Sequence, residues 1–146
     1  GGPIEVGAVA GQVVAPPPLE VVRTDEVVTG MPPPEEVVAA YWHHINEGRF
    51  EDAWVLLSSR FQDDRFGGGV QGLREHYAEM GLCRVVAEEV SLLEQDADSA
   101  VVAARMLYET GSRCELDAFD FDFHFVYDAD RAAWLLDDSV WQGVSQ

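Results

Sequence analysis

Apolar residues recur at helical spacing in the first half of the chain and at alternating positions in the second half. Residues 35–48 begin with acidic side chains after a proline, as helices often do. One helical face of this segment carries Val38, Tyr41, Trp42 and Ile45. A second, short helix is expected to begin near Phe50, and a third should cover residues 70–81. The pattern therefore predicts three helices before the first strand.

Alternating apolar and polar residues then predict four strands: residues 84–94, 99–110, 116–127, and a last strand that carries Trp134, Leu136 and Val140. The third strand is the most regular, because one face of it carries Phe119, Phe121, Phe123, Phe125 and Tyr127. The turns between consecutive strands are short, which requires antiparallel pairing. The expected fold class is α+β, with three N-terminal helices packed on an antiparallel sheet of four or more strands.

Residues 1–34 differ in composition from the rest of the chain. They are built mainly from Gly, Val, Ala and Pro, and their two triple-proline runs favour an extended tether. Residues 19–28, between these runs, are β-prone enough to add a strand to a sheet edge. We expect a Pro-rich N-terminal arm or linker over residues 1–34 and a folded domain over residues 35–146. Without an initiator Met or a signal sequence, the chain is expected to be a processed or truncated product.

Composition narrows the range of partners. Hydrophobic residues make up 47% of the 146 residues, which is too apolar for a disordered chain. The 27 acidic residues face only nine basic ones, all of them Arg, and the net charge of −18 argues against nucleic acid as a partner. No apolar run reaches the ~18 residues of a membrane span, so we expect no membrane insertion by this segment.

Two stretches of the sequence resemble a known superfamily. Residues 35–61, EEVVAAYWHHINEGRFEDAWVLLSSRF, resemble the opening helix pair of the nuclear transport factor 2-like superfamily, and residues 123–139, FHFVYDADRAAWLLDDS, resemble its closing hairpin. The resemblance implies a curved antiparallel sheet wrapped around helices, a cone with a pocket at its wide end. In style the sequence is similar to bacterial extracytoplasmic members found beside membrane anchors or sensor kinases. This similarity implies an extracytoplasmic or membrane-tethered location, while a cytoplasmic one stays open.

The resemblance also implies a ligand pocket. Tyr41 and His44 of the first helix are expected to reach it, with Trp54, Phe61 and Phe66 near its mouth. Our main hypothesis is a non-catalytic domain that binds a small apolar ligand or a protein partner, without a cofactor. The alternative is a small-molecule isomerase, dehydratase or cyclase of the ketosteroid isomerase-like type that uses Tyr41 and His44. No base carboxylate can be matched to that chemistry, and a pure protein-interaction module is a third hypothesis.

Asp120, Asp122 and His124 form an acidic stripe on the other face of the third strand. Such a stripe could bind a divalent cation or relay protons. Because the opposite face carries the Phe residues, we expect the stripe to face solvent. Neighbouring His43 and His44 diverge by about 100° on a helix and cannot share one metal ion, so no metal site is predicted. Superfamily members often form homodimers through the outer sheet face, although like charges on this stripe oppose that arrangement.

Cys83 and Cys114 are the only two cysteines of the sequence. Folding the first two strands about their turn brings Cys83 within a few residues of Cys114, which allows a disulfide. A disulfide would suit an oxidising compartment. Two buried free thiols are the other interpretation of the same pair.

Overall fold

The structure is a computed structural model that describes residues 31–145 of the chain. The arm predicted over residues 1–34 lies, apart from its last residues, outside the described part. The described elements follow one another as helices and then strands, in the order that the apolar pattern predicts. None of the described helices has the length and apolar character needed to cross a membrane.

The helices begin and end at the residues that favour such boundaries. Helix α1 (Pro34–Asn46) has a proline in its first turn and is followed by α2 (Phe50–Trp54), α3 (Ser59–Phe66) and α4 (Val70–Met80). The last of these ends at Gly81, which adopts the left-handed backbone conformation that glycine tolerates best. Side chains of α1 that recur at helical spacing are buried: Val37, Val38, Tyr41, Trp42 and Ile45.

Residues 31–145 contain four helices where the sequence pattern predicts three. The additional helix, α3, carries only two apolar residues, Phe61 and Phe66, so it lacks the periodicity by which a helix is recognised. Its ends are defined instead by capping. Ser58 accepts a hydrogen bond from the backbone N–H of Phe61 at 3.1 Å, and Gly67 closes the helix in the left-handed conformation.

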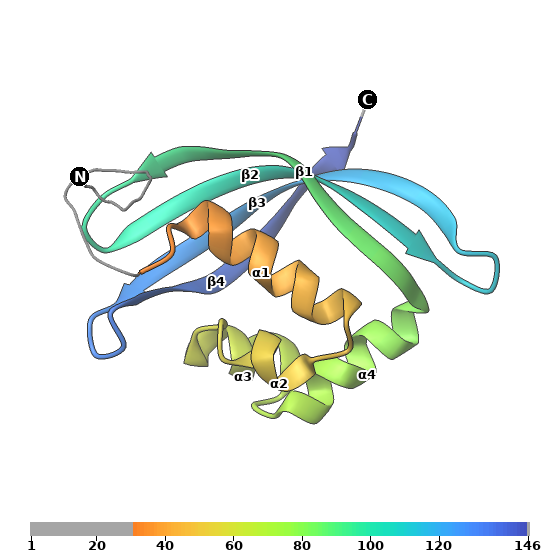
Figure 1. The fold of residues 1–146 in the computed structure, drawn as a ribbon, viewed down its shortest axis with the longest axis horizontal. Coiled ribbons are helices and arrows are strands. Elements are labelled where there is room, and N and C mark those ends of the chain that lie inside the picture. The colour runs from red at the N-terminus through yellow and green to blue at the C-terminus, as the bar shows by residue number, and fades with distance from the viewer. Residues whose placement is uncertain (1–30, 146) are drawn as a thin grey trace, which may run out of the picture. The chain divides into compact units, whose positions relative to one another are not determined.

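The four predicted strands are confirmed. They are β1 (Leu82–Gln95), β2 (Ser99–Thr110), β3 (Glu115–Asp128) and β4 (Ala133–Val144). They form one antiparallel sheet in the order β1-β2-β3-β4, and α1 lies against its concave side while α2, α3 and α4 lie further from it (Figure 1). The α+β fold class is therefore confirmed for the described residues.

The core lies between α1 and the inner face of the sheet. Phe123 and Phe125 are only 1% exposed and turn toward the helices. The pairing of β2 with β3 has no register shift, so the alternation of β3 is preserved along its length. A second connection comes from the segment before α3, where Leu57 forms a parallel bridge with Leu136 of β4. The helical layer is thus attached to the sheet by hydrogen bonds as well as by apolar contacts.

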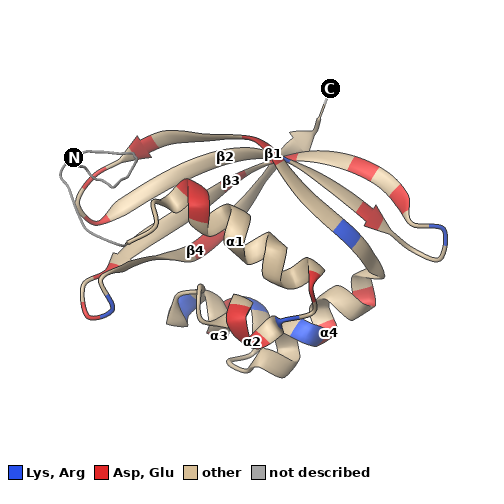
Figure 2. Cartoon of the chain, viewed as in Figure 1, with Lys and Arg blue, Asp and Glu red and all other residues tan. Residues whose placement is uncertain are grey.

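The acidic stripe lies on the outer face of the sheet. Since Phe123 and Phe125 are in the core, alternation places Asp120, Asp122 and His124 on the opposite side of β3. Acidic residues elsewhere are spread over helices, strand ends and turns (Figure 2). Within residues 31–145, no group of three or more His, Cys, Asp or Glu side chains is arranged to hold a metal ion.

A disulfide joins Cys83, at the start of β1, to Cys114, in the turn before β3. The two Cα atoms are 5.8 Å apart, within the reach that the folded hairpin predicts. A backbone hydrogen bond from Gly111 to Gly81, at 2.9 Å, connects the same two segments. The disulfide therefore closes the end of the sheet at which α4 enters β1.

Candidate functional site

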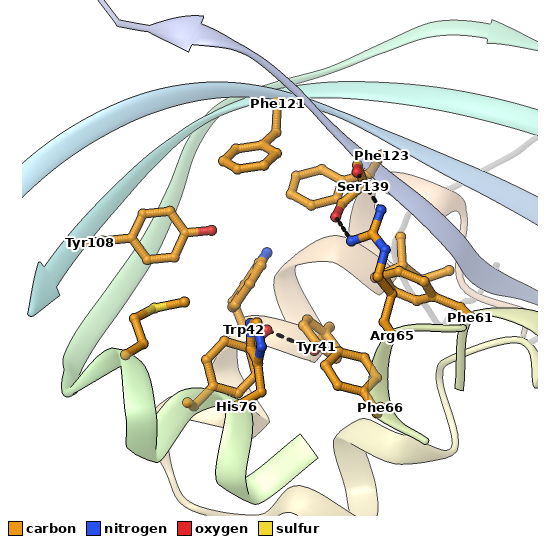
Figure 3. Close-up of a pocket in the computed structure, with 13 residues that line it drawn as sticks. Tyr41, Trp42, Phe61, Arg65, Phe66, His76, Tyr108, Phe121, Phe123 and Ser139 are labelled. Atoms are coloured by element: carbon orange, nitrogen blue, oxygen red, sulfur yellow. Dashed lines mark hydrogen bonds between the residues drawn. The ribbon is translucent and has the colours of Figure 1, made fainter. Parts of the chain in front are cut away.

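A cavity of about 250 Å³ lies between the helices and the inner face of the sheet (Figure 3). Its wall comes from α1, α3, α4 and the three strands β2, β3 and β4. The lining residues are Tyr41, Trp42, Phe61, Arg65, Phe66, His76, Tyr77, Met80, Tyr108, Phe121, Phe123, Leu136 and Ser139. The cavity is slightly smaller than the roughly 300–1,000 Å³ of pockets for drug-sized ligands, which limits it to a small molecule.

Trp42 stands at the centre of the aromatic part of the wall. Its ring meets those of Tyr41, Tyr108 and Phe123 edge to face, with centroids 4.8, 6.0 and 6.3 Å away. Phe121 is stacked on Phe123 at 5.8 Å on the sheet side. Such edge-to-face contacts fix ring positions and give the cavity a rigid apolar surface.

A pair of tyrosines joins α1 to α4 at the wall. The hydroxyls of Tyr41 and Tyr77 are 3.0 Å apart and share one hydrogen bond. Burial raises the pKa of both phenols well above the ordinary value of 10.0. Both hydroxyls therefore stay protonated at neutral pH. One proton of the pair is used in the mutual bond, so only the other is available to a ligand.

Two basic side chains form the polar side of the wall. Arg65 of α3 donates to Asp138 at 2.5 Å and to the backbone carbonyl of Ser139 at 3.1 Å, which orients it and offsets its charge. His76 of α4 packs edge-on against Phe66 and Tyr77. Burial and, to a smaller extent, the Arg65 charge lower the pKa of His76. His76 is therefore neutral at physiological pH.

Of the five residues predicted for the pocket, Tyr41, Phe61 and Phe66 line this cavity. His44 and Trp54 are not among the lining residues. His44 follows Tyr41 by three positions, which rotates it about 60° away on the helix, and it is only half-buried. Trp54 packs edge-on against Phe66 from outside the wall, with ring centroids 6.2 Å apart. The predicted cluster is thus divided between the cavity and its surroundings.

Several wall residues were not predicted as part of a site. The apolar pattern assigns Trp42, Tyr77 and Tyr108 to buried faces, but it cannot distinguish a residue that fills the core from one that borders a cavity. Nothing in the sequence marks Arg65 or His76 as part of a site, because each is one polar residue among the other polar residues of its helix. Only the packing of three elements reveals their position.

Solved structures share this arrangement of helices and sheet. A ketosteroid isomerase-like protein from Erwinia carotovora atroseptica superposes with a TM-score of 0.57 over 77% of this chain and 94% of its own, at 14% identity. An NTF2-like protein of unknown function in nutrient uptake from Rhodospirillum rubrum superposes with a TM-score of 0.55 over 76% of this chain and 95% of its own, at 15% identity. The domain has the nuclear transport factor 2-like fold. The fold expected from the two sequence stretches is thereby confirmed.

A sequence relative provides a different kind of information about this domain. The serine/threonine-protein kinase PknA of Nostoc sp. is 32% identical over 128 residues, which cover 79% of this chain. The match covers 20% of the kinase, so the chain spans about a fifth of that protein's length. No protein-family model matches the sequence.

Proposed function

We propose that this domain is a non-catalytic module that binds a small, largely apolar ligand in the cavity and acts outside the cytoplasm as part of a larger protein. Likeness to a fifth of a protein kinase supports the role of an attached module. The Cys83–Cys114 disulfide supports an oxidising compartment, because such bonds are rare in the cytosol.

The observation that carries the proposal is the chemistry of the cavity wall. Among its described residues the wall is mostly aromatic and contains no Asp or Glu. General acid–base catalysis needs a base and a donor that converge on one substrate atom. Tyr41 already shares its hydroxyl with Tyr77, and His44 lies away from the wall. These features favour binding over the isomerase, dehydratase or cyclase hypothesis.

His76 is the specific feature that favours the enzymatic alternative. It is a neutral imidazole on the cavity wall, and a neutral imidazole can accept a proton. Its ring is 4.8 Å from that of Tyr77, so a base and a phenol donor lie side by side. An isomerase that uses His76 and the tyrosine pair is therefore the second candidate function.

Two measurements separate these functions. Titration of the ¹⁵N-labelled domain with indane, a bicyclic hydrocarbon, should shift amide resonances around the cavity. Met80→Trp at the cavity wall should abolish those shifts, whereas Leu116→Trp, at a residue 60% exposed on β3, should keep them. A wild-type spectrum that indane leaves unchanged contradicts the binding module.

The second measurement uses 1-indanone in D₂O, where catalysed enolisation would replace the hydrogens next to the carbonyl by deuterium. We expect the exchange rate with the domain to equal that of buffer. Faster exchange that drops about a hundredfold in Tyr41→Phe or His76→Gln would establish the enzymatic alternative, since that is the loss expected on removing a catalytic donor.

A further inference from the structure

The indole N–H of Trp42 has no hydrogen-bond partner among the described residues, although its nitrogen is buried. The residue as a whole is only 6% exposed and lines the cavity. Figure 3 shows the Trp42 ring edge-on, with its nitrogen on the edge directed toward the cavity and the sheet. A buried donor left without an acceptor costs about 1–3 kcal/mol, so such groups are rarely left unused in a folded protein.

Tyr108 provides a second donor on the opposite wall. Its hydroxyl points into the same space as the Trp42 nitrogen, and no hydrogen bond connects it to the other lining residues (Figure 3). Burial raises the pKa of this phenol, so it keeps its proton at neutral pH. Trp42 comes from α1 and Tyr108 from β2, with ring centroids 6.0 Å apart. The two donors therefore face one small volume from two different elements.

We infer that the cavity selects a small, neutral, ring-shaped ligand whose carbonyl oxygen accepts hydrogen bonds from the Trp42 indole N–H and the Tyr108 hydroxyl. This inference rests on the proposed binding function and names its ligand class. A carbonyl oxygen has two lone pairs and can accept from both donors at once. The rings of Phe121, Phe123 and Tyr41 then enclose the apolar body of the ligand.

Charge on the wall favours a neutral acceptor over a carboxylate. The two donors, the Trp42 indole N–H and the Tyr108 hydroxyl, are both uncharged. An anion buried among uncharged donors loses more hydration free energy than their hydrogen bonds restore. The cation on the wall, Arg65, is already paired with Asp138 and Ser139. The other basic group, His76, has a lowered pKa and is neutral at physiological pH. No described group on the wall offers a free positive charge to a carboxylate.

Three probes of nearly one shape test the inference: indane, 1-indanone and indane-1-carboxylate. The dissociation constant of each is measured by NMR titration of the ¹⁵N-labelled domain. We expect 1-indanone to bind about five- to thirtyfold more tightly than indane, the range for one or two net hydrogen bonds of about 1 kcal/mol each. The carboxylate should bind more weakly than the ketone.

Variants assign this preference to the two donors. Trp42→Phe and Tyr108→Phe should each reduce the preference for 1-indanone over indane, while indane still binds. Trp141→Phe is the matched control, because Trp141 is 59% exposed on β4 and should leave all three constants unchanged. The Trp42 indole resonance, assigned by its loss in Trp42→Phe, should move downfield with 1-indanone and not with indane. If Trp42→Phe fails to fold, Tyr108→Phe and this resonance still decide the inference.

The failure of the inference can be distinguished from failure of the proposed function. If all three probes bind equally, or the preference survives in both variants, the carbonyl site is refuted and the binding module stands. If the carboxylate binds most tightly, the ligand is an anion and the neutral class is wrong. If no probe shifts any resonance, both proposals fall together.

Discussion

Gly72, in the first turns of α4, should not tolerate even a methyl group. A Cβ atom placed on Gly72 would lie 1.9 Å from the backbone carbonyl oxygen of Phe66 and 2.8 Å from its carbonyl carbon. Ordinary van der Waals contact begins near 3.4 Å, so either α3 or α4 would have to shift. The obstacle is backbone, which cannot rotate away as a side chain can. Glycine at this position permits the close approach of the two helices.

The expected cost of Gly72→Ala follows from two opposing effects. Alanine in a helix interior is normally favoured over glycine by about 1 kcal/mol. Overpacking that displaces backbone costs about 1–3 kcal/mol, and a contact this short belongs at the upper end. We therefore expect a net loss of about 2 kcal/mol in the free energy of unfolding. For a domain of about 115 residues this corresponds to a melting temperature lower by roughly 8 °C.

Urea unfolding followed by circular dichroism measures this effect. Gly69→Ala is the matched control, because a Cβ at Gly69 would meet no atom within 4 Å. It should cost less than about 1 kcal/mol, the size of a weakened helix N-cap. A Gly72→Ala variant as stable as wild type, or more stable, would refute the close packing of α3 on α4. Because Phe66 lines the cavity, the variant should also bind indane more weakly.

Further predictions concern the disulfide, a helix cap, pH and association. Replacing Cys83 and Cys114 by Ser should lower the free energy of unfolding by about 3–4 kcal/mol in the chain-entropy model, because the disulfide joins residues 31 positions apart. Urea unfolding with and without reductant measures this loss, and an unchanged unfolding midpoint contradicts it. Ser58→Ala should cost about 1 kcal/mol, because it removes the N-cap of α3 and the 2.6 Å hydrogen bond to Asp137; a thermal melt equal to wild type argues against this role. Since the pKa of His76 is lowered in the folded state, the unfolded chain binds the proton first, so stability should fall as pH falls through 6.5. His76→Gln should flatten that part of the stability profile, and an unchanged slope assigns it elsewhere. If copies associate through the outer sheet face, sedimentation should show a dimer that strengthens with added salt, because screening weakens repulsion between the acidic stripes; weakening with salt contradicts that geometry.

Most of the fold could be predicted from the apolar pattern, because the decisive elements bury one regular face. The alternation of β3 assigns Phe123 to the core and Asp122 to the outer face, and its pairing with β2 has no register shift that would disturb this. Helix α3 could not be predicted in this way. It is held by the Ser58 cap and by polar contacts with distant residues. One of these joins Arg60 to Asp137 at 2.8 Å, across 77 positions of the sequence.

The site was less predictable than the fold for a physical reason. A pattern of apolar positions tells which side chains turn inward, but a cavity is the volume that inward side chains leave unfilled. Tyr41 and Trp42 are adjacent and both buried, yet the Tyr41 hydroxyl is hydrogen-bonded to Tyr77, whereas the Trp42 indole nitrogen has no partner among the described residues. That difference depends on what α4 and β2 place opposite each residue. His44, expected in the pocket, lies beyond the part of α1 that faces those elements.

The edges of the two outer strands, β1 and β4, affect how readily this domain aggregates with other chains. An unpaired strand edge can template pairing with another sheet and so start aggregation. Within the described sheet, β1 has three register shifts against β2, and its Glu88, Glu89 and Glu94 place charge along that edge. On the other side, the Leu57 bridge occupies part of β4. Bulges, charged side chains and a covering segment all hinder hydrogen bonding between the strand edges of two molecules. We therefore expect the long strands of the described sheet to resist edge-to-edge aggregation.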